Sequence, residues 1–142
     1  MFAFASDIEI DAPPERVWAL LTDAAAYPTW NPTVTEVRGE VALGRRIVVH
    51  AAIANGKGFP VRVAVLDAPR RMVWRGGAPL RFLFRGERVF TLTPAGQRVH
   101  FSMREEFSGL LAGLIRRSFP DLQPAFDDFA KALKRAAEAP PA

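Results

Sequence analysis

The chain of 142 residues lacks cysteine, has only two histidines, and is poor in lysine, with just Lys57, Lys131 and Lys134. Without cysteine there is neither a disulfide framework nor a thiolate zinc site, so we expect a reducing, cytoplasmic location. Two isolated histidines without a carboxylate at ligand spacing also fail to form a metal site. We therefore predict no metal and no cofactor.

Long apolar runs are also missing. No stretch of 18 apolar residues occurs, and residues 1–7 carry neither a basic leader nor a sustained apolar segment. This pattern predicts no membrane span and no export signal. The net charge of +4 is compatible with nucleic-acid binding, but the arginines are scattered and no recognition motif is present. We expect no nucleic-acid partner.

What is present is typical of one globular domain. Hydrophobic residues make up 49% of the chain and charged residues 24%, which argues against disorder. We predict a single domain over residues 1–139, a disordered tail at 140–142, and either a monomer or a homodimer.

The first third predicts a strand followed by helix. Over residues 3–11, Ile8 and Ile10 alternate with acidic residues, as in a half-buried strand. Two prolines at 13 and 14 suit a first helical turn, and an apolar stripe then continues to about residue 23. The proline-rich residues 27–32 predict a turn or a second short helical piece.

The middle of the chain predicts antiparallel strands separated by glycine- and proline-containing turns. The expected strands are 33–41, 45–54, 59–67, 71–76, 81–93 and 98–107. Because the connections are short, we expect a meander, since parallel strands would require long crossovers.

The last third changes period. An apolar segment from Leu110 to Ile115 predicts a helical piece that Pro120 interrupts. A longer helix is expected to begin near Asp121, which is a good N-cap. Its apolar stripe has helical spacing and consists of Phe126, Phe129, Ala130, Leu133 and Ala137.

This order of elements predicts an α+β helix-grip fold, in which a curved sheet of about seven strands wraps a long C-terminal helix. Three local motifs carry a resemblance over almost the whole chain: residues 13–18 (PPERVW), 27–32 (YPTWNP) and 105–111 (EEFSGLL). With them the chain resembles the START-like or SRPBCC superfamily. That resemblance implies an apolar internal cavity for a small molecule.

One departure from the family concerns possible chemistry. Similar bacterial sequences often carry a histidine two residues before the strand phenylalanine, where this chain has Arg88 before Phe90. An acid–base role of that histidine therefore does not transfer to this chain.

Strand parity brings two charged residues to the expected inner face. Glu105 shares a face with Phe101, Met103 and Phe107, while Arg88 shares one with Phe82, Phe84, Gly86, Phe90 and Leu92. Arg88 could orient a carboxylate or enolate of a ligand, with Glu105 as counter-charge or general base. Alternatively, the two form a structural ion pair.

The remaining candidate ligand-binding residues are polar or aromatic. His50 lies on the face of Val48 and Ala52, which we take as inward, whereas His100 is expected outward. Trp30 and Asn31 precede a strand where such folds open their pocket, and a core plug with a turn cap is the alternative. The predicted aromatic and thioether walls are Trp74, Phe84, Phe90, Phe101, Met103, Phe126 and Phe129.

Three functions are compatible with these residues. The first is binding of a hydrophobic or aromatic small molecule, lipid- or polyketide-like, between the sheet and the C-terminal helix. The second is a cyclase- or dehydratase-like enzyme with Glu105 as the candidate catalytic, proton-transferring group. The third is an interaction module resembling activators of a heat-shock ATPase, which would expose an apolar patch instead of an internal void.

Overall fold

Seven antiparallel strands form one curved sheet in the computed structural model, which describes residues 1–140. The strands are β1 (Phe2–Ile10), β2 (Val34–Arg38), β3 (Arg46–Ala51), β4 (Lys57–Asp67), β5 (Arg71–Gly76), β6 (Arg85–Ala95) and β7 (Arg98–Ser108). The α-helices are α1 (Pro14–Thr22), α2 (Tyr27–Trp30), α3 (Ala112–Ile115) and α4 (Gln123–Glu138). Short 3-10 turns at Ala24–Ala26, Ala52–Ala54 and Arg116–Ser118 complete the elements.

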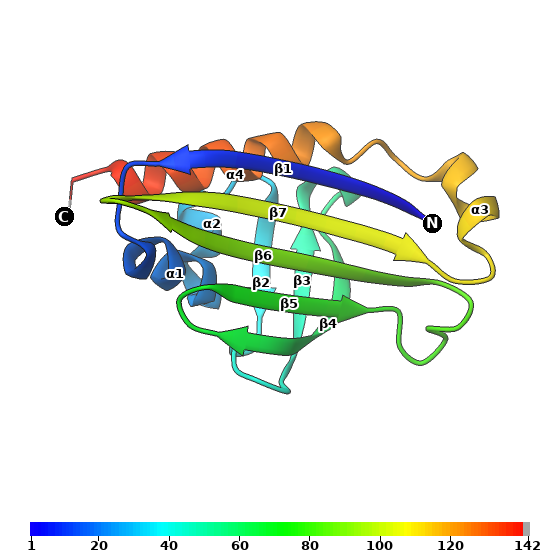
Figure 1. The fold of residues 1–142 in the computed structure, drawn as a ribbon. Helices are drawn as coiled ribbons and strands as arrows, with labels where there is room; N and C mark the ends of the chain where they lie inside the picture. Colours follow the sequence, from blue (N-terminus) through cyan, green and yellow to red (C-terminus); the bar gives the residue numbers. More distant parts are fainter. Residues whose placement is uncertain (141–142) are drawn as a thin grey trace.

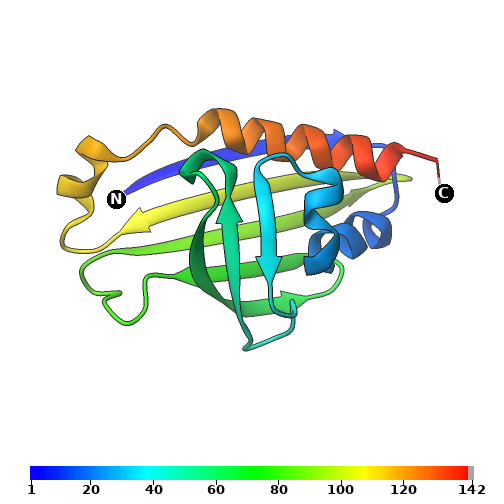
Figure 2. The same ribbon diagram turned by 180° about the vertical axis from the view of Figure 1, so that it is seen from behind.

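The strands run β1-β7-β6-β5-β4-β3-β2 across the sheet. Strands β2 to β7 form the predicted meander, and β1 joins its end by pairing with β7. Figures 1 and 2 show α4 lying along β1 and across the concave side, with α1 and α2 near one end and α3 at the other. The predicted helix-grip fold of about seven strands is confirmed.

Helix α4 closes the concave side because its apolar stripe faces the sheet. Phe126, Phe129, Ala130, Leu133 and Ala137 are each no more than 2% exposed, as their spacing predicted. Alternating residues of β1, β6 and β7 meet them, and Ile10, Phe90, Leu92, Val99, Phe101 and Met103 are likewise almost fully buried. The main core therefore lies between the inner face of the sheet and α4.

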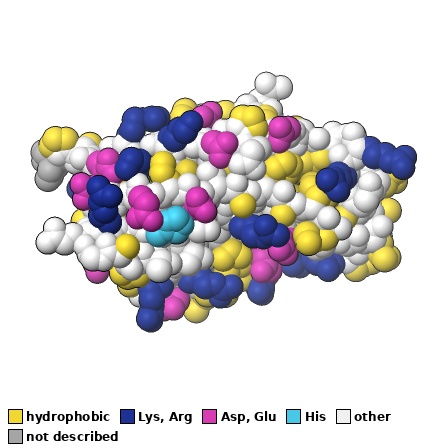
Figure 3. Space-filling model, turned by 45° about the horizontal axis from the view of Figure 1, so that its top comes forward, with side chains coloured by type: hydrophobic (Ala, Val, Ile, Leu, Met, Phe, Trp, Pro, Cys, Tyr) yellow, Lys and Arg dark blue, Asp and Glu magenta, His cyan; other side chains and the backbone are white. Residues whose placement is uncertain are grey.

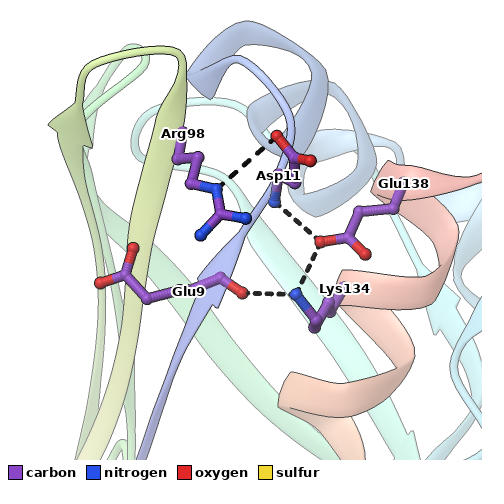
Figure 4. A network of polar contacts seen from close by, with 5 residues as sticks. All are labelled: Glu9, Asp11, Arg98, Lys134 and Glu138. Carbon is purple, nitrogen blue, oxygen red and sulfur yellow. Dashed lines mark hydrogen bonds and ion pairs between the residues drawn. The ribbon is translucent and has the colours of Figure 1, made fainter.

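Polar contacts fix the C-terminal end of α4 to β1 and α1. The Lys134 Nζ donates to the Glu9 carbonyl at 2.8 Å, and the Asp11 N–H donates to the Glu138 carboxylate at 2.7 Å (Figure 4). Arg16 of α1 donates to the carbonyls of Ala137 and Ala139. The Arg16 donors satisfy carbonyls that a helix end otherwise leaves without partners.

The beginning of α4 differs slightly from the prediction. The helix starts at Gln123, and Leu122 occupies the N-cap position where Asp121 was expected. Asp121 still serves this end, because its Oδ1 accepts the Gln123 N–H at 3.0 Å.

The strand predicted over 81–93 begins only at Arg85. Residues 80–84 instead form a local turn in which the Leu83 and Phe84 N–H groups both donate to the Leu80 carbonyl, at 3.0 and 3.1 Å. These bonds replace ladder pairing, so Phe82 is 61% exposed and its predicted inward position is wrong.

The other strand boundaries shift by a few residues. The strand expected over 33–41 ends at Arg38, before Gly39 with φ 103°, and the strand expected over 45–54 ends at Ala51. Of the predicted tail, Pro140 follows α4 without regular structure, and residues 141–142 lie outside the described residues.

Candidate ligand-binding site

Arg88 and Glu105 meet on the inner face, as strand parity predicted. They are direct neighbours in the β6–β7 register, and Glu105 Oε1 accepts from Arg88 Nε at 3.0 Å and from Nη2 at 2.8 Å. The side chains keep 19% and 16% of their surface exposed. This charge-assisted pair is therefore sheltered but still reached by solvent.

The pair belongs to a row that crosses the sheet. Trp74 of β5 is opposite Arg88, and Phe4 of β1 is opposite Glu105. Phe126 of α4 covers the row, because the Arg88 guanidinium lies 4.8 Å from its ring centre. One cation and one carboxylate thus lie among aromatic side chains from two strands and a helix.

Two glycines lie in the next row of the inner face, between Val61 of β4 and Phe107 of β7. Gly76 of β5 and Gly86 of β6 are paired in register beside the ion pair. A Cβ at Gly86 would lie 3.1 Å from Glu105 Oε2, so glycine allows the carboxylate to occupy this position. Because both Arg88 bonds go to Oε1, Oε2 has no protein donor among the described residues.

Trp30, Asn31 and Trp74 bring further N–H donors to the interior. The indole Nε1 of each tryptophan and the Nδ2 of Asn31 are buried without a hydrogen-bond partner within residues 1–140. The Asn31 oxygen, in contrast, accepts from the Thr33 N–H and hydroxyl at 3.0 and 2.7 Å. Asn31 therefore caps the turn before β2, as the structural alternative predicted, while its amide N–H groups remain free.

Tyr27 is a site residue that the sequence analysis missed. Its ring lies between the two tryptophans, 5.1 Å from Trp30 and 6.3 Å from Trp74 between centres. It is fully buried, and its hydroxyl donates to the Leu21 carbonyl at 2.6 Å. Burial raises the pKa of this hydroxyl well above its ordinary value, although the Arg88 charge opposes the rise. The sole tyrosine of the chain, inside the YPTWNP motif, was the available signal.

The predicted wall residues divide into two aromatic groups. Phe90, Phe101, Met103 and Phe129 pack in the main core, with the Phe129 ring 6.0 Å from that of Phe90. Phe84 instead packs with Phe2, Phe4, Phe107 and Phe119 at the α3 end of the concave side. The Arg88–Glu105 pair lies between the two groups.

Two hollows of the described residues lie elsewhere, along β1. The larger, of about 440 Å³, is lined by residues that include Phe4, Arg104 and Phe119, and the smaller, of about 310 Å³, includes Ser6 and Asp127. Neither touches Arg88 or Glu105. Buried aromatic side chains, among them Phe90, Phe101 and Phe129, occupy the concave side between the sheet and α4.

His50 is placed on the outer face, so its predicted inward position is wrong. In β3, Ile47 is fully buried and Val49 packs on the core, which sends the alternate residues Val48 and His50 outward. The His50 ring lies over Gly58, and its Nδ1 is 2.8 Å from the Gly56 carbonyl oxygen. His100 faces outward as expected, with Nδ1 2.7 Å from the Glu9 carboxylate.

Residues 1–140 offer neither a metal cluster nor a membrane-spanning helix. No group of three His, Cys, Asp or Glu side chains there is placed to hold a metal ion. None of the described helices is long and apolar enough to cross a membrane. An apolar patch does occur at the α3 end, where Leu110 is 80% exposed and Leu114 65%. Such a patch was the expected mark of an interaction module.

Comparison with protein families gives one match over nearly the whole chain. The model of the family described as "Polyketide cyclase / dehydrase and lipid transport" matches residues 1–138. Among curated proteins, none matches the sequence.

Solved structures share the fold. A protein from Mesorhizobium loti is 20% identical with a TM-score of 0.74, covering 95% of this chain and 96% of that one. A START superfamily protein from Mycobacterium smegmatis is 17% identical with a TM-score of 0.68, covering 96% and 97%. The di-domain ARO/CYC BexL of the BE-7585A biosynthetic pathway is 20% identical with a TM-score of 0.73, covering 97% of this chain and 47% of BexL. This chain therefore spans about half of BexL.

Proposed function

Since the chain belongs to the polyketide cyclase / dehydrase and lipid transport family, we propose that it binds a hydrophobic or aromatic small molecule bearing an anionic or carbonyl oxygen. The proposed site is the row of Trp74, Arg88 and Glu105 on the concave side. The observation that carries this proposal is the unpartnered Trp74 indole N–H beside Arg88 in that row. Buried N–H groups without partners are costly, so a ligand oxygen would satisfy one.

The surroundings support an amphipathic ligand. Phe126 covers the Arg88 guanidinium, while Gly86 leaves room for the Glu105 carboxylate beside the Phe107 ring. An aromatic or acyl body would contact the phenylalanine rings, and its oxygen would take hydrogen bonds from Arg88 and the indole. Because aromatic side chains occupy the concave side, binding requires them to move apart, which makes ligand binding and local opening coupled.

Anilinonaphthalene sulfonate is a suitable probe, because it combines fused aromatic rings with an anionic oxygen group. We expect its fluorescence to rise on binding, with energy transfer from the tryptophans. Arg88→Met should lower its affinity at least about tenfold, since the anion loses its charged donor. Trp74→Phe, which keeps the aromatic wall but removes the N–H, should lower it several-fold.

The matched control is Arg75→Met. Arg75 and Glu87 form the same kind of cross-strand pair on the outer face, with Nε and Oε2 2.7 Å apart. All measurements are made in a Leu110→Ser, Leu114→Ser background, so that the exposed patch does not capture the dye. Equal affinity of the Arg88 and Arg75 variants would refute the proposed site. Native mass spectrometry of protein purified from its own host then tests for a retained molecule.

A second candidate function is proton transfer by Glu105, favoured by its free Oε2. This oxygen would take a proton from the α-carbon of an enolisable substrate, and Arg88 would stabilise the enolate that forms. The test is deuterium exchange at the α-carbon of an acetoacetyl thioester, followed by NMR. Glu105→Gln should abolish catalysed exchange while the far-UV circular dichroism stays unchanged. Exchange no faster with the unaltered protein than in buffer would exclude this activity for the probe.

A further inference from the structure

Five exposed apolar side chains gather at the α3 end of the molecule. We call them the apolar tip: Leu80, Phe82, Leu110, Leu111 and Leu114, with exposed fractions of 54, 61, 80, 39 and 65%. They come from the β5–β6 connection and from the β7–α3 connection with α3 itself, which Figures 1 and 2 place at the same end. Exposed apolar groups of this number and closeness mark an interaction surface.

Backbone hydrogen bonds hold the two connections side by side. The Leu110 N–H donates to the Phe82 carbonyl at 3.1 Å, and the Leu111 N–H donates to the Leu83 carbonyl at 2.8 Å. Beneath them, the stacked rings of Phe84 and Phe107 are 5.7 Å apart between centres. The apolar tip is therefore a supported surface of the fold and not a pair of loose loops.

The segments that form the apolar tip carry charge of one sign. Arg81 lies in the β5–β6 connection and Arg85 begins β6, while Arg116 and Arg117 follow α3. Residues 76–86 and 107–120 contain no aspartate or glutamate. Within residues 1–140, none of these four arginines forms an ion pair with an acidic side chain. The α3 end in Figure 3, on the right, shows basic and hydrophobic side chains without acidic ones.

We propose that the apolar tip and its four arginines dock on an anionic lipid bilayer surface. Leucine and phenylalanine insert at the boundary between headgroups and acyl chains, and the arginines contact lipid phosphates. A second copy of the chain is disfavoured as occupant, because symmetric contact would bring the same arginines together without acidic partners. The proposal does not depend on a ligand at Arg88.

Vesicle sedimentation tests the docking. The full chain is mixed with phosphatidylcholine vesicles and with vesicles that also contain phosphatidylglycerol. We expect binding to the anionic vesicles that weakens as salt rises. Arg116→Gln with Arg117→Gln should lower the partition coefficient about tenfold on anionic vesicles. Leu110→Ser with Leu114→Ser should lower it by about tenfold or more.

The β2–β3 connection supplies a matched control, because it also exposes a leucine (Leu43, 65%) and Arg45, with the exposed Arg46 at the start of β3. Leu43→Ser, or Arg45→Gln with Arg46→Gln, should leave vesicle binding unchanged. Failure to bind anionic vesicles, or equal losses from both connections, would overturn the proposal. So would a dimer in light scattering that the Leu110→Ser, Leu114→Ser variant abolishes, because the apolar tip would then serve self-association. None of these outcomes changes the binding of anilinonaphthalene sulfonate that we expect at Arg88, so the two proposals can fail separately.

Discussion

Both ends of the molecule have apolar residues at helical spacing, but these residues are buried at one end and exposed at the other. At one end, Val17 and Leu21 of α1 and Leu133 of α4 are fully buried against the sheet. At the other end, Leu110 and Leu114 are mostly exposed. Helical spacing of leucines thus predicts a helical segment at both ends, whereas only one end has an apolar surface to cover it.

The Arg88–Glu105 pair lies between these ends, at the change from the main core to the aromatic group around Phe84. Its side chains stay 19% and 16% exposed, although Phe126 of α4 is as deeply buried as Phe129, at 2%. We expect the closed end to provide stability and the α3 end to provide contacts with other molecules.

Truncation in the closed end should have the largest effect. Phe129 is 2% exposed and lies within 6.3 Å of Tyr27, Trp30, Phe90 and Phe101 between ring centres. Phe129→Ala should lower the free energy of unfolding by about 3–5 kcal/mol, as large cavities do. Leu114→Ala, at the exposed end, should change it by no more than about 0.5 kcal/mol. Urea denaturation measures both, and similar losses would contradict the distinction between the two ends.

The ion pair should show an intermediate effect. Arg88→Met alone should cost about 2 kcal/mol, because Glu105 is then left sheltered without its partner. Adding Glu105→Leu should restore stability to within about 1 kcal/mol of the unaltered protein.

The outer pair Arg75–Glu87 provides the comparison for this cycle. Its side chains are 48% and 39% exposed, so Arg75→Met should cost only about 0.5 kcal/mol. A double-mutant cycle in urea gives both coupling energies. Equal coupling for the two pairs would mean that the concave side does not shelter Arg88 and Glu105 from water.

The smallest effect is expected at the polar network of α4. The Lys134 ammonium and the Asp11 N–H hold the pKa of Glu138 below its ordinary value of 4.5. A carboxylate whose pKa is lower in the folded state stabilises the fold at pH values above its unfolded-state pKa. This contribution is lost as the pH falls through the folded-state pKa. Glu138→Gln should therefore lower Tm slightly at pH 7 and leave it unchanged well below pH 4. A Tm difference that persists in acid would exclude this origin.

Much of the concave side was predictable because strands alternate. In β7, apolar residues at every second position place Glu105 inward, and the same parity in β6 places Arg88 opposite it. In β3, both parities are apolar, with Ile47 and Val49 on one face and Val48 on the other. Alternation alone could not choose there, which is why His50 was misplaced.

The helix-grip fold followed from the sequence, because apolar periods of two and of 3.6 residues, with glycine and proline between them, determine element type and order. The sequence also determined the charge and apolar content of the segment around α3. Only the tertiary structure decided which segments lie together. Register placed Trp74 beside Arg88, local turn bonds at Leu80 kept Phe82 out of β6, and the extent of α4 left Leu110 uncovered. These outcomes depend on contacts between residues far apart in the chain or on competing local bonds, which periodicity does not encode.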